Sequence, residues 1–179
     1  MTTWIAFFRG INVGGHNRLS MSSLVALLNR LGCEQVRTYI QSGNAVFRCD
    51  ARRPDEIEAK IAAAIAKAHG FEPRVVVMTV NELDKAIAAN PFPKAVDNHK
   101  SLHFYFLSEP VPRPNLAALN AAKAANEAFA IAKEVFYLHS PGGIGKSKLA
   151  ERVEKLLGVD ATARNWRTVC AVRDLVADD

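Results

Sequence analysis

The segment between residues 9 and 18 has the composition of an anion-binding loop. Its sequence is Arg-Gly-Ile-Asn-Val-Gly-Gly-His-Asn-Arg, with three glycines, two arginines, one histidine and no carboxylate. Glycines permit positive φ angles and close approach of the backbone, and backbone N–H groups ahead of a helix bind anions. We therefore predict that an anionic ligand contacts Arg9, Gly10, Asn12, Gly14 and Gly15. The alternative is a connection that needs glycine only to turn.

A second glycine-rich segment, Ser140-Pro-Gly-Gly-Ile-Gly-Lys-Ser147, is similar to a phosphate-binding P-loop. The full P-loop pattern needs glycine where this chain has Ser140, and it follows a strand of a parallel sheet rather than a small hairpin. We therefore predict either a weaker anion site formed by Lys146 and Ser147 or a plain turn with a helix cap.

The third polar segment spans residues 162–168, Thr-Ala-Arg-Asn-Trp-Arg-Thr. Thr162 is a suitable cap for a last helix, on which Arg164 and Arg167, three residues apart, would share one face. The functional interpretation is that Arg164, Asn165 and Arg167 reach the ligand of the glycine loop. The alternative is helix capping together with one core tryptophan.

Other residue types give weaker signals. Asn44 closes the tight turn of residues 39–44 and is a ligand candidate, although turn chemistry alone explains it. The five histidines lack metal-ligand spacing, and only His16, inside the glycine-rich segment, suggests a test for catalysis. The three cysteines are widely spaced, which predicts reduced thiols rather than a disulfide framework or zinc site. The sequence therefore predicts no metal site, and it leaves any cofactor and any catalytic residues unknown.

Composition places the chain among ordinary globular proteins. Its 179 residues are 49% hydrophobic and 23% charged, with a net charge of +5. No long apolar run predicts a membrane span and no signal peptide is evident, so we expect a cytoplasmic protein with no membrane partner. The basic residues are uneven: the first 33 residues contain no acid, and Lys146 to Arg173 contains seven basic residues against three acids. This bias indicates either solubilising charge or one anion-binding surface shared by both ends of the chain.

Apolar periodicity and turn signals predict how these segments are positioned. The first half has the order βαββαβ, with strands at 4–8, 36–41, 45–49 and 74–79 and helices starting after Ser20 and at Pro54. The second half begins with a short helix started by Asn81 and Asp84. It continues with strands at 101–107, 129–132 and 135–139 and helices at 114–125, 146–157 and 163–176.

This order predicts an α+β protein made of two ferredoxin-like (α/β plait) halves packed together, with antiparallel sheets and helices on one face. The predicted domains are 1–80, a βαββαβ domain, and 81–179, a second plait-like domain with an extra C-terminal helix. The strands at 4–8 and 74–79 are apolar on both faces, so we expect the other half of the chain or a second subunit to cover the open face.

Four motifs in the same order, 9–15, 39–44, 147–149 and 162–169, closely resemble the bacterial family known as domain of unknown function 1697. The resemblance spans nearly the whole chain and implies a two-part α+β protein with plait-like halves. It implies no activity and no catalytic residue.

Three classes of function remain open. The first is a protein that binds a phosphorylated or otherwise anionic small molecule in a composite site of residues 9–18 and 162–168. The second is an enzyme that acts on such a ligand. The third is a nucleic-acid-binding module, against which the strand Ala45–Cys49 has only one aromatic residue.

Overall fold

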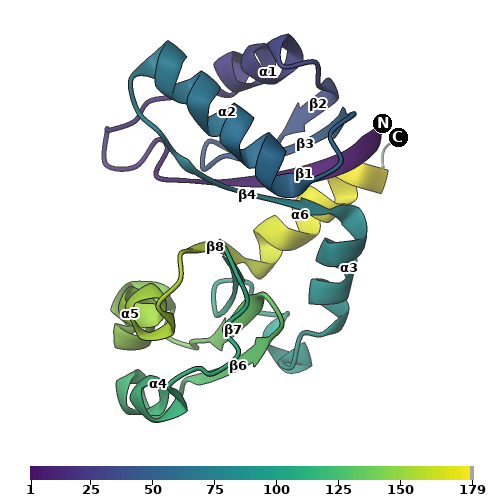
Figure 1. Cartoon of the computed structure of the whole chain (residues 1–179). Helices are drawn as coiled ribbons and strands as arrows, with labels where there is room; N and C mark the ends of the chain where they lie inside the picture. The colour runs from purple at the N-terminus through teal and green to yellow at the C-terminus, as the bar shows by residue number, and fades with distance from the viewer. Residues whose placement is uncertain (178–179) are drawn as a thin grey trace. The chain divides into compact units, whose positions relative to one another are not determined.

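The structure is a computed structural model that describes residues 1–177, and within them it contains two four-stranded antiparallel sheets and six α-helices (Figure 1). The elements in the first half of the chain are β1 (Thr2–Arg9), α1 (Met21–Arg30), β2 (Glu34–Thr38), β3 (Asn44–Cys49), α2 (Pro54–His69), β4 (Arg74–Thr79) and α3 (Val80–Ala88). Those in the second half are β5 (Leu102–Leu107), α4 (Leu116–Ala122), β6 (Ala128–Ala132), β7 (Val135–His139), α5 (Lys148–Leu157), β8 (Ala161–Asn165) and α6 (Trp166–Ala177).

The chain divides into two compact units. Unit 1 contains Met1–Lys85 and the C-terminal residues from Ala171, and unit 2 contains Ala86–Cys170. Both divisions fall inside helices, one in α3 and one in α6. The predicted domain boundary at residue 80 stays a prediction; by its contacts, the second half of α6 belongs with unit 1.

Both sheets have the same topology. The strand order is β2-β3-β1-β4 in unit 1 and β6-β7-β5-β8 in unit 2, and each unit has the chain order βαββαβ. This is the split βαβ arrangement, in which the two crossovers place both helices on one face of the sheet. The predicted α+β class with two antiparallel sheets is confirmed.

Unit 2 has a fourth strand that the sequence analysis missed. Ala161–Asn165 pairs with β5, so the last helix starts at Trp166 and not near residue 163. Thr162 is therefore a buried strand residue, and the prediction that it caps the helix was wrong. The cap is Asn165, whose Oδ1 accepts a hydrogen bond from the Thr168 N–H at 2.9 Å. The second half is consequently a complete plait followed by α6.

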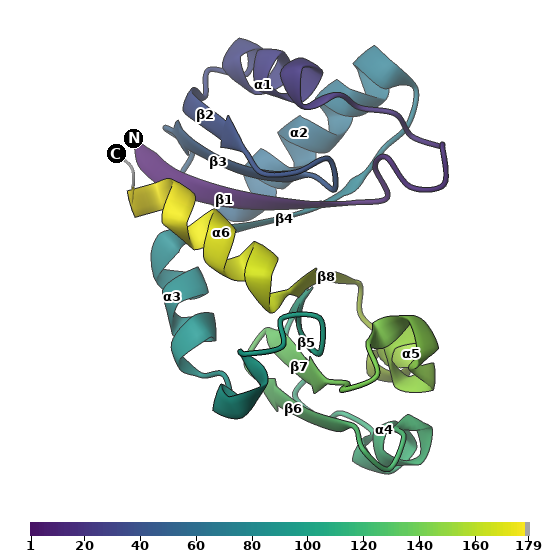
Figure 2. The same cartoon turned by 180° about the vertical axis from the view of Figure 1, so that it is seen from behind.

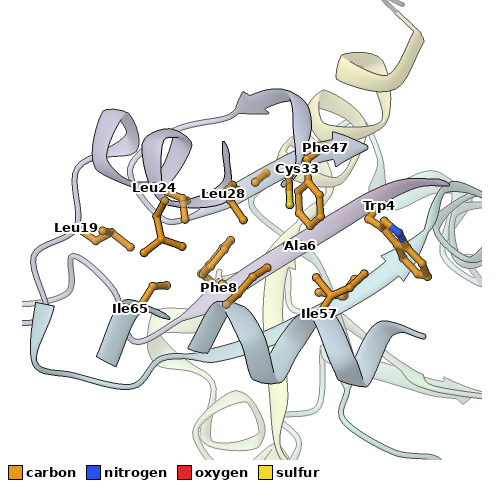
Figure 3. Packing of buried hydrophobic residues seen from close by; sticks show 14 of the residues in the cluster. Trp4, Ala6, Phe8, Leu19, Leu24, Leu28, Cys33, Phe47, Ile57 and Ile65 are labelled. Carbon is orange, nitrogen blue, oxygen red and sulfur yellow. The ribbon is translucent and has the colours of Figure 1, made fainter. Parts of the chain in front are cut away.

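Helices α1 and α2 cover one face of the unit 1 sheet. Ser20 caps α1 as predicted, with its hydroxyl accepting a hydrogen bond from the Ser23 N–H, and Pro54 opens α2. Figure 3 shows Trp4, Ala6 and Phe8 of β1 among the apolar side chains of the two helices. Alternation along the strand places Ile5 and Phe7 on the opposite face, where they are also buried.

That opposite face lies beside the C-terminal half of α6 (Figure 2). Arg37 of β2 donates a hydrogen bond from Nη1 to the carbonyl oxygen of Leu175 at 2.7 Å, and Arg173 forms an ion pair with Asp84. A guanidinium group at the end of a helix also interacts favourably with the helix dipole. A segment of the chain's own C-terminal end is thus part of unit 1.

In unit 2, aromatic side chains fill the sheet face opposite α4 and α5. Phe104 contacts Tyr137 edge-on, with ring centroids 4.7 Å apart, and packs against Trp166 at 5.6 Å. The Tyr137 hydroxyl donates a hydrogen bond to the carbonyl oxygen of Ala86 at 2.8 Å, so this buried polar atom has a partner. Trp166 is therefore part of this packing, as the structural alternative expected.

Several element ends also differ from the predictions. Helix α3 follows β4 directly, because Thr79 and Glu82 form a capping box in place of the expected Asn81 start. Strand β2 ends at Thr38 rather than Gln41. Helix α4 begins after Asn115, which caps it, and α5 begins after Ser147.

Candidate functional site

The glycine-rich loop of residues 10–18 projects from the end of β1 as a small exposed hairpin. Val13 and His16 form an isolated antiparallel bridge, with the His16 N–H donating to the Val13 carbonyl oxygen at 3.0 Å. Between them, Gly14 and Gly15 have φ angles of 58° and 80°, which only glycine adopts at low cost. The predicted residues Gly14 and Gly15 therefore lie at an exposed tip, where a ligand can approach the backbone.

Asn12 anchors this loop to the rest of unit 1. Its Nδ2 donates to the carbonyl oxygens of Leu19 and Gln41, both at 2.8 Å, and its Oδ1 accepts from the Leu19 N–H at 2.8 Å. Asn12 also has a φ angle of 54°, a conformation that asparagine tolerates better than most residues. The side chain thus already binds three backbone groups, which is a structural role for this predicted ligand residue.

The turn of residues 39–44 packs directly against the glycine-rich loop. The Phe8 N–H donates to the Gly43 carbonyl oxygen at 2.9 Å. A Cβ atom added at Gly43 would lie 2.4 Å from Ile11 Cδ1 and 2.7 Å from Phe8 Cβ, so this position requires glycine. Two of the predicted motifs, although separated in sequence, therefore form one substructure.

Asn44 is fully buried in this substructure. Its Nδ2 donates to the Tyr39 carbonyl oxygen at 2.8 Å and contacts the Ser42 hydroxyl at 3.3 Å. The neighbouring Ile40 is half-exposed at a φ angle of 47°, which is strained for a β-branched residue. Asn44 thus stabilises the turn from inside, and the surface of the turn is formed by other residues.

Two arginines meet at the base of the glycine-rich loop. Arg9 ends β1, Arg74 begins β4, and the register of the two strands places them directly opposite each other. Residues opposite in an antiparallel pair project from the same face, so the two side chains lie on one face of the sheet. Both residues are exposed, as are His16 and Arg18 in the loop. Sequence reasoning selected Arg9 but missed Arg74, because only strand pairing brings it close.

The Ser140–Ser147 turn of unit 2 is built around a buried carboxylate. Glu127 Oε1 accepts a hydrogen bond from the Ser140 hydroxyl at 2.8 Å, and Oε2 accepts from the Ala124 N–H at 2.8 Å. Burial acts to raise the pKa of Glu127, but hydrogen bonds from the Ser147 hydroxyl, the Ala124 N–H and the Ser140 hydroxyl lower it below the ordinary value. The turn is therefore organised by a negative charge supplied by the protein.

The Ser147 hydroxyl already makes hydrogen bonds within the protein. Its Oγ accepts a hydrogen bond from the Ala150 N–H at 3.0 Å, which caps α5, and the hydroxyl also forms a hydrogen bond with Glu127. Lys146 is exposed, and an anion near it would also meet the field of the Glu127 carboxylate. These contacts support the alternative of a turn and a helix cap. Glu127 was not predicted from the sequence because it precedes the turn.

The 162–168 segment does not present its arginines on one helical face, so that prediction was wrong. Arg164 belongs to β8 and Arg167 to α6. Arg164 and Asn165 project from opposite sides of the sheet because strand residues alternate. Arg164 is buried, donates from Nη1 to the Ala163 carbonyl oxygen at 2.8 Å, and has its pKa lowered to about 10 by burial. Arg167 is exposed, and the predicted contribution of this motif to the ligand of the glycine loop stays a prediction.

The described residues show few other features of catalytic sites. In residues 1–177, no group of three or more His, Cys, Asp or Glu side chains could hold a metal ion. No described helix is long and apolar enough to cross a membrane. His103 is buried between β7 and β8, its Nδ1 makes no hydrogen bond, and burial lowers its pKa to about 4. It is therefore a neutral core histidine at physiological pH.

Comparisons with known proteins place the chain in a family. The conserved bacterial protein SP0830 from Streptococcus pneumoniae has a similar structure, with a TM-score of 0.74, 20% identity and 98% coverage of each chain. At this identity the likeness shows the fold. Among curated proteins, none matches the chain. The sequence model described as "Protein of unknown function (DUF1697)" matches residues 1–137, so the chain belongs to that family, as its motifs indicated.

Proposed function

We propose that unit 1 binds an anionic small molecule, such as a phosphorylated metabolite, at the base of the glycine-rich loop. The observation that carries this proposal is the pairing of Arg9 with Arg74 at the end of β1 and β4. An anion that accepts hydrogen bonds from both guanidinium groups would form charge-assisted bonds with them.

The loop beside this arginine pair supports the same interpretation. Gly10, Gly14 and Gly15 all have positive φ angles, and a Cβ atom added at Gly10 or Gly15 would meet nothing within 4 Å. The backbone of the loop is thus open to an approaching ligand. Asn12 and Gly43 hold the loop in place, so the ligand would meet a preformed surface.

The experiment is a thermal-shift and calorimetric titration with sulfate, inorganic phosphate, nucleotides and sugar phosphates. A ligand at about 100 times its Kd stabilises the native state by about 2.7 kcal/mol. Arg9→Ala and Arg74→Ala should each weaken binding about tenfold or more, because a hydrogen bond to a charged group contributes about 1.5–3 kcal/mol.

Arg52→Ala is the matched control. Arg52 is exposed and follows β3, whose last residue, Cys49, pairs with Thr2 at the other end of β1. This variant loses the same charge far along the sheet and should bind like the wild type. Equal loss in all three variants would indicate a general effect of net charge and contradict the proposal. Steeply salt-dependent binding to nucleic acid, with no response to small anions, would favour the nucleic-acid class. The same titration on Arg167→Ala tests the predicted contribution of the second motif.

A further inference from the structure

Two cysteines face each other across neighbouring strands of unit 1. The register of β2 and β3 pairs Glu34 with Arg48, and extending it by one residue places Cys33 opposite Cys49. Cys33 belongs to the core beneath α1 and α2, as Figure 3 shows, and Cys49 packs against the same core. A hydrogen bond also joins the side chains of Cys33 and Cys49. The two thiols are therefore adjacent, although 16 positions separate them in the sequence.

A β-bulge in β2 produces this juxtaposition. Val36 packs against the same core as Cys33, yet residues three apart in a regular strand project from opposite faces. The register of β2 shifts between Glu34 and Arg37, and Gln35 has a φ angle of 50°. The extra residue at the bulge shifts the alternation of side chains by one position, so that both Val36 and Cys33 face the core. Without the bulge, Cys33 would project away from Cys49.

Directly opposite residues of an antiparallel pair have Cβ atoms about 4.5–5.5 Å apart, and a disulfide needs about 3.5–4.5 Å. The two cysteines are therefore near the distance of a disulfide, and a small local shift of the strands brings them within it. Cys33 is 5% exposed, whereas Cys49 has intermediate exposure, so an oxidant from solvent reaches Cys49 first. We propose that Cys33 and Cys49 form a reversible dithiol–disulfide site, in which Cys49 reacts with a hydroperoxide or a small-molecule disulfide and Cys33 completes the bond.

The chemistry balances with either oxidant. The Cys49 thiolate attacks one oxygen of a hydroperoxide and forms a sulfenic acid, while the other oxygen leaves and takes up the proton that Cys49 lost. The sulfur of Cys33 then attacks the Cys49 sulfur, and hydroxide leaves with the Cys33 proton as water. The two thiols lose two electrons, which the peroxide bond receives. With a small disulfide, Cys49 forms a mixed disulfide and Cys33 displaces the second thiol.

The environment of the Cys33 thiol indicates that Cys33 acts in the second step, the attack on the oxidised Cys49. Burial raises the pKa of the Cys33 thiol to about 12, with further contributions from the Cys49 charge and from the hydrogen bond between the two side chains. A protonated thiol is a poor nucleophile, so Cys33 does not initiate the reaction. Once Cys49 is oxidised, attack by Cys33 is intramolecular, and proximity offsets its low reactivity.

The test uses the reduced full-length chain, treated with hydrogen peroxide or oxidised glutathione and then alkylated and digested with trypsin. The cysteines fall on the separate tryptic peptides 31–37, 49–52 and 168–173. We expect a linkage between the first two peptides that dithiothreitol reverses, with Cys170 remaining available to the alkylating agent. A Cys49 mixed disulfide that persists in the wild type, or linkage of Cys49 to Cys170, would overturn the proposal.

Single variants separate the two steps. Cys33→Ala and Cys33→Ser should stop at a Cys49 sulfenic acid that dimedone traps, or at a stable mixed disulfide. Cys49→Ala should leave Cys33 unmodified in the folded protein. Cys170→Ala is the matched control and should form the disulfide at the wild-type rate. Circular dichroism checks the fold of each variant; if the Cys33 variants are unfolded, the wild-type linkage map and the Cys170→Ala rate decide the question. Equal oxidation of Cys33 in Cys49→Ala would refute the order of steps.

Discussion

Replacement of Gly43 by alanine tests whether the 39–44 turn and the glycine-rich loop are one substructure. Alanine at the observed φ of 81° costs about 1–2 kcal/mol for left-handed backbone. The added Cβ would also lie 2.4 Å from Ile11 Cδ1 and 2.7 Å from Phe8 Cβ. Forcing such a contact in a packed core costs about 1–3 kcal/mol more. We therefore expect Gly43→Ala to lower the free energy of unfolding by about 2–5 kcal/mol.

Gly70→Ala in the same unit is the matched control. Gly70 ends α2 with a φ of 77°, close to that of Gly43, but a Cβ added there meets nothing within 4 Å. It carries the conformational cost without the clash, so the difference between the two variants isolates the steric contribution of about 1–3 kcal/mol.

Urea unfolding followed by tryptophan fluorescence is the assay. The chain has two tryptophans, Trp4 in the core of unit 1 and Trp166 in unit 2, so a Trp166→Phe background reports on unit 1 alone. Adding Ile11→Val removes the atom nearest to the new Cβ and should recover part of the loss. Equal destabilisation by Gly43→Ala and Gly70→Ala would refute the close-packing argument. It would also be refuted if the changes in unfolding free energy caused by Gly43→Ala and Ile11→Val simply added in the double variant.

Three further predictions concern ionisable side chains. The lowered pKa of Glu127 means that its contribution to stability is present above about pH 4.5, the unfolded value, and is lost as the pH falls through the folded pKa. Glu127→Gln should therefore flatten the acid limb of a plot of Tm against pH. His103 has a folded pKa of about 4 against 6.5 unfolded, so stability should fall as the pH drops from 6.5 towards 4, and His103→Gln should remove that slope. Arg37→Gln removes the hydrogen bond to Leu175 and should cost about 1 kcal/mol in urea unfolding, with Arg52→Gln unchanged.

Local signals in the sequence predicted most elements of unit 1. The Ser20 cap, the helix start at Pro54 and strand β4 follow from residue types that act within one turn or along one strand. Strand β8 was missed because its local signals indicate the start of a helix. Thr162 and Asn165 are both good helix caps, and only pairing with β5 makes the segment between them extended.

The candidate site shows the same limit. Arg9 and the glycines stand out in the sequence, but Arg74 comes close to Arg9 only through the register of β1 and β4. Asn12 and Asn44 have polar side chains, yet their hydrogen bonds to backbone groups show that they hold loops in place. A side-chain type indicates which bonds a residue can make, and the folded backbone decides which partners it meets.

The two glycine-rich turns show how much depends on the neighbouring charge. Both lie between a strand and a helix, and both contain glycines and a basic residue. In unit 2 the Glu127 carboxylate accepts hydrogen bonds from the hydroxyl groups of Ser140 and Ser147. These hydroxyl groups would otherwise be available to donate to a bound anion. In unit 1 the loop contains no acid and lies beside the Arg9–Arg74 pair. Coulombic repulsion by the Glu127 carboxylate disfavours an anion at the turn of unit 2, whereas the basic side chains attract an anion to the loop of unit 1. Anion binding by this chain is therefore expected at unit 1.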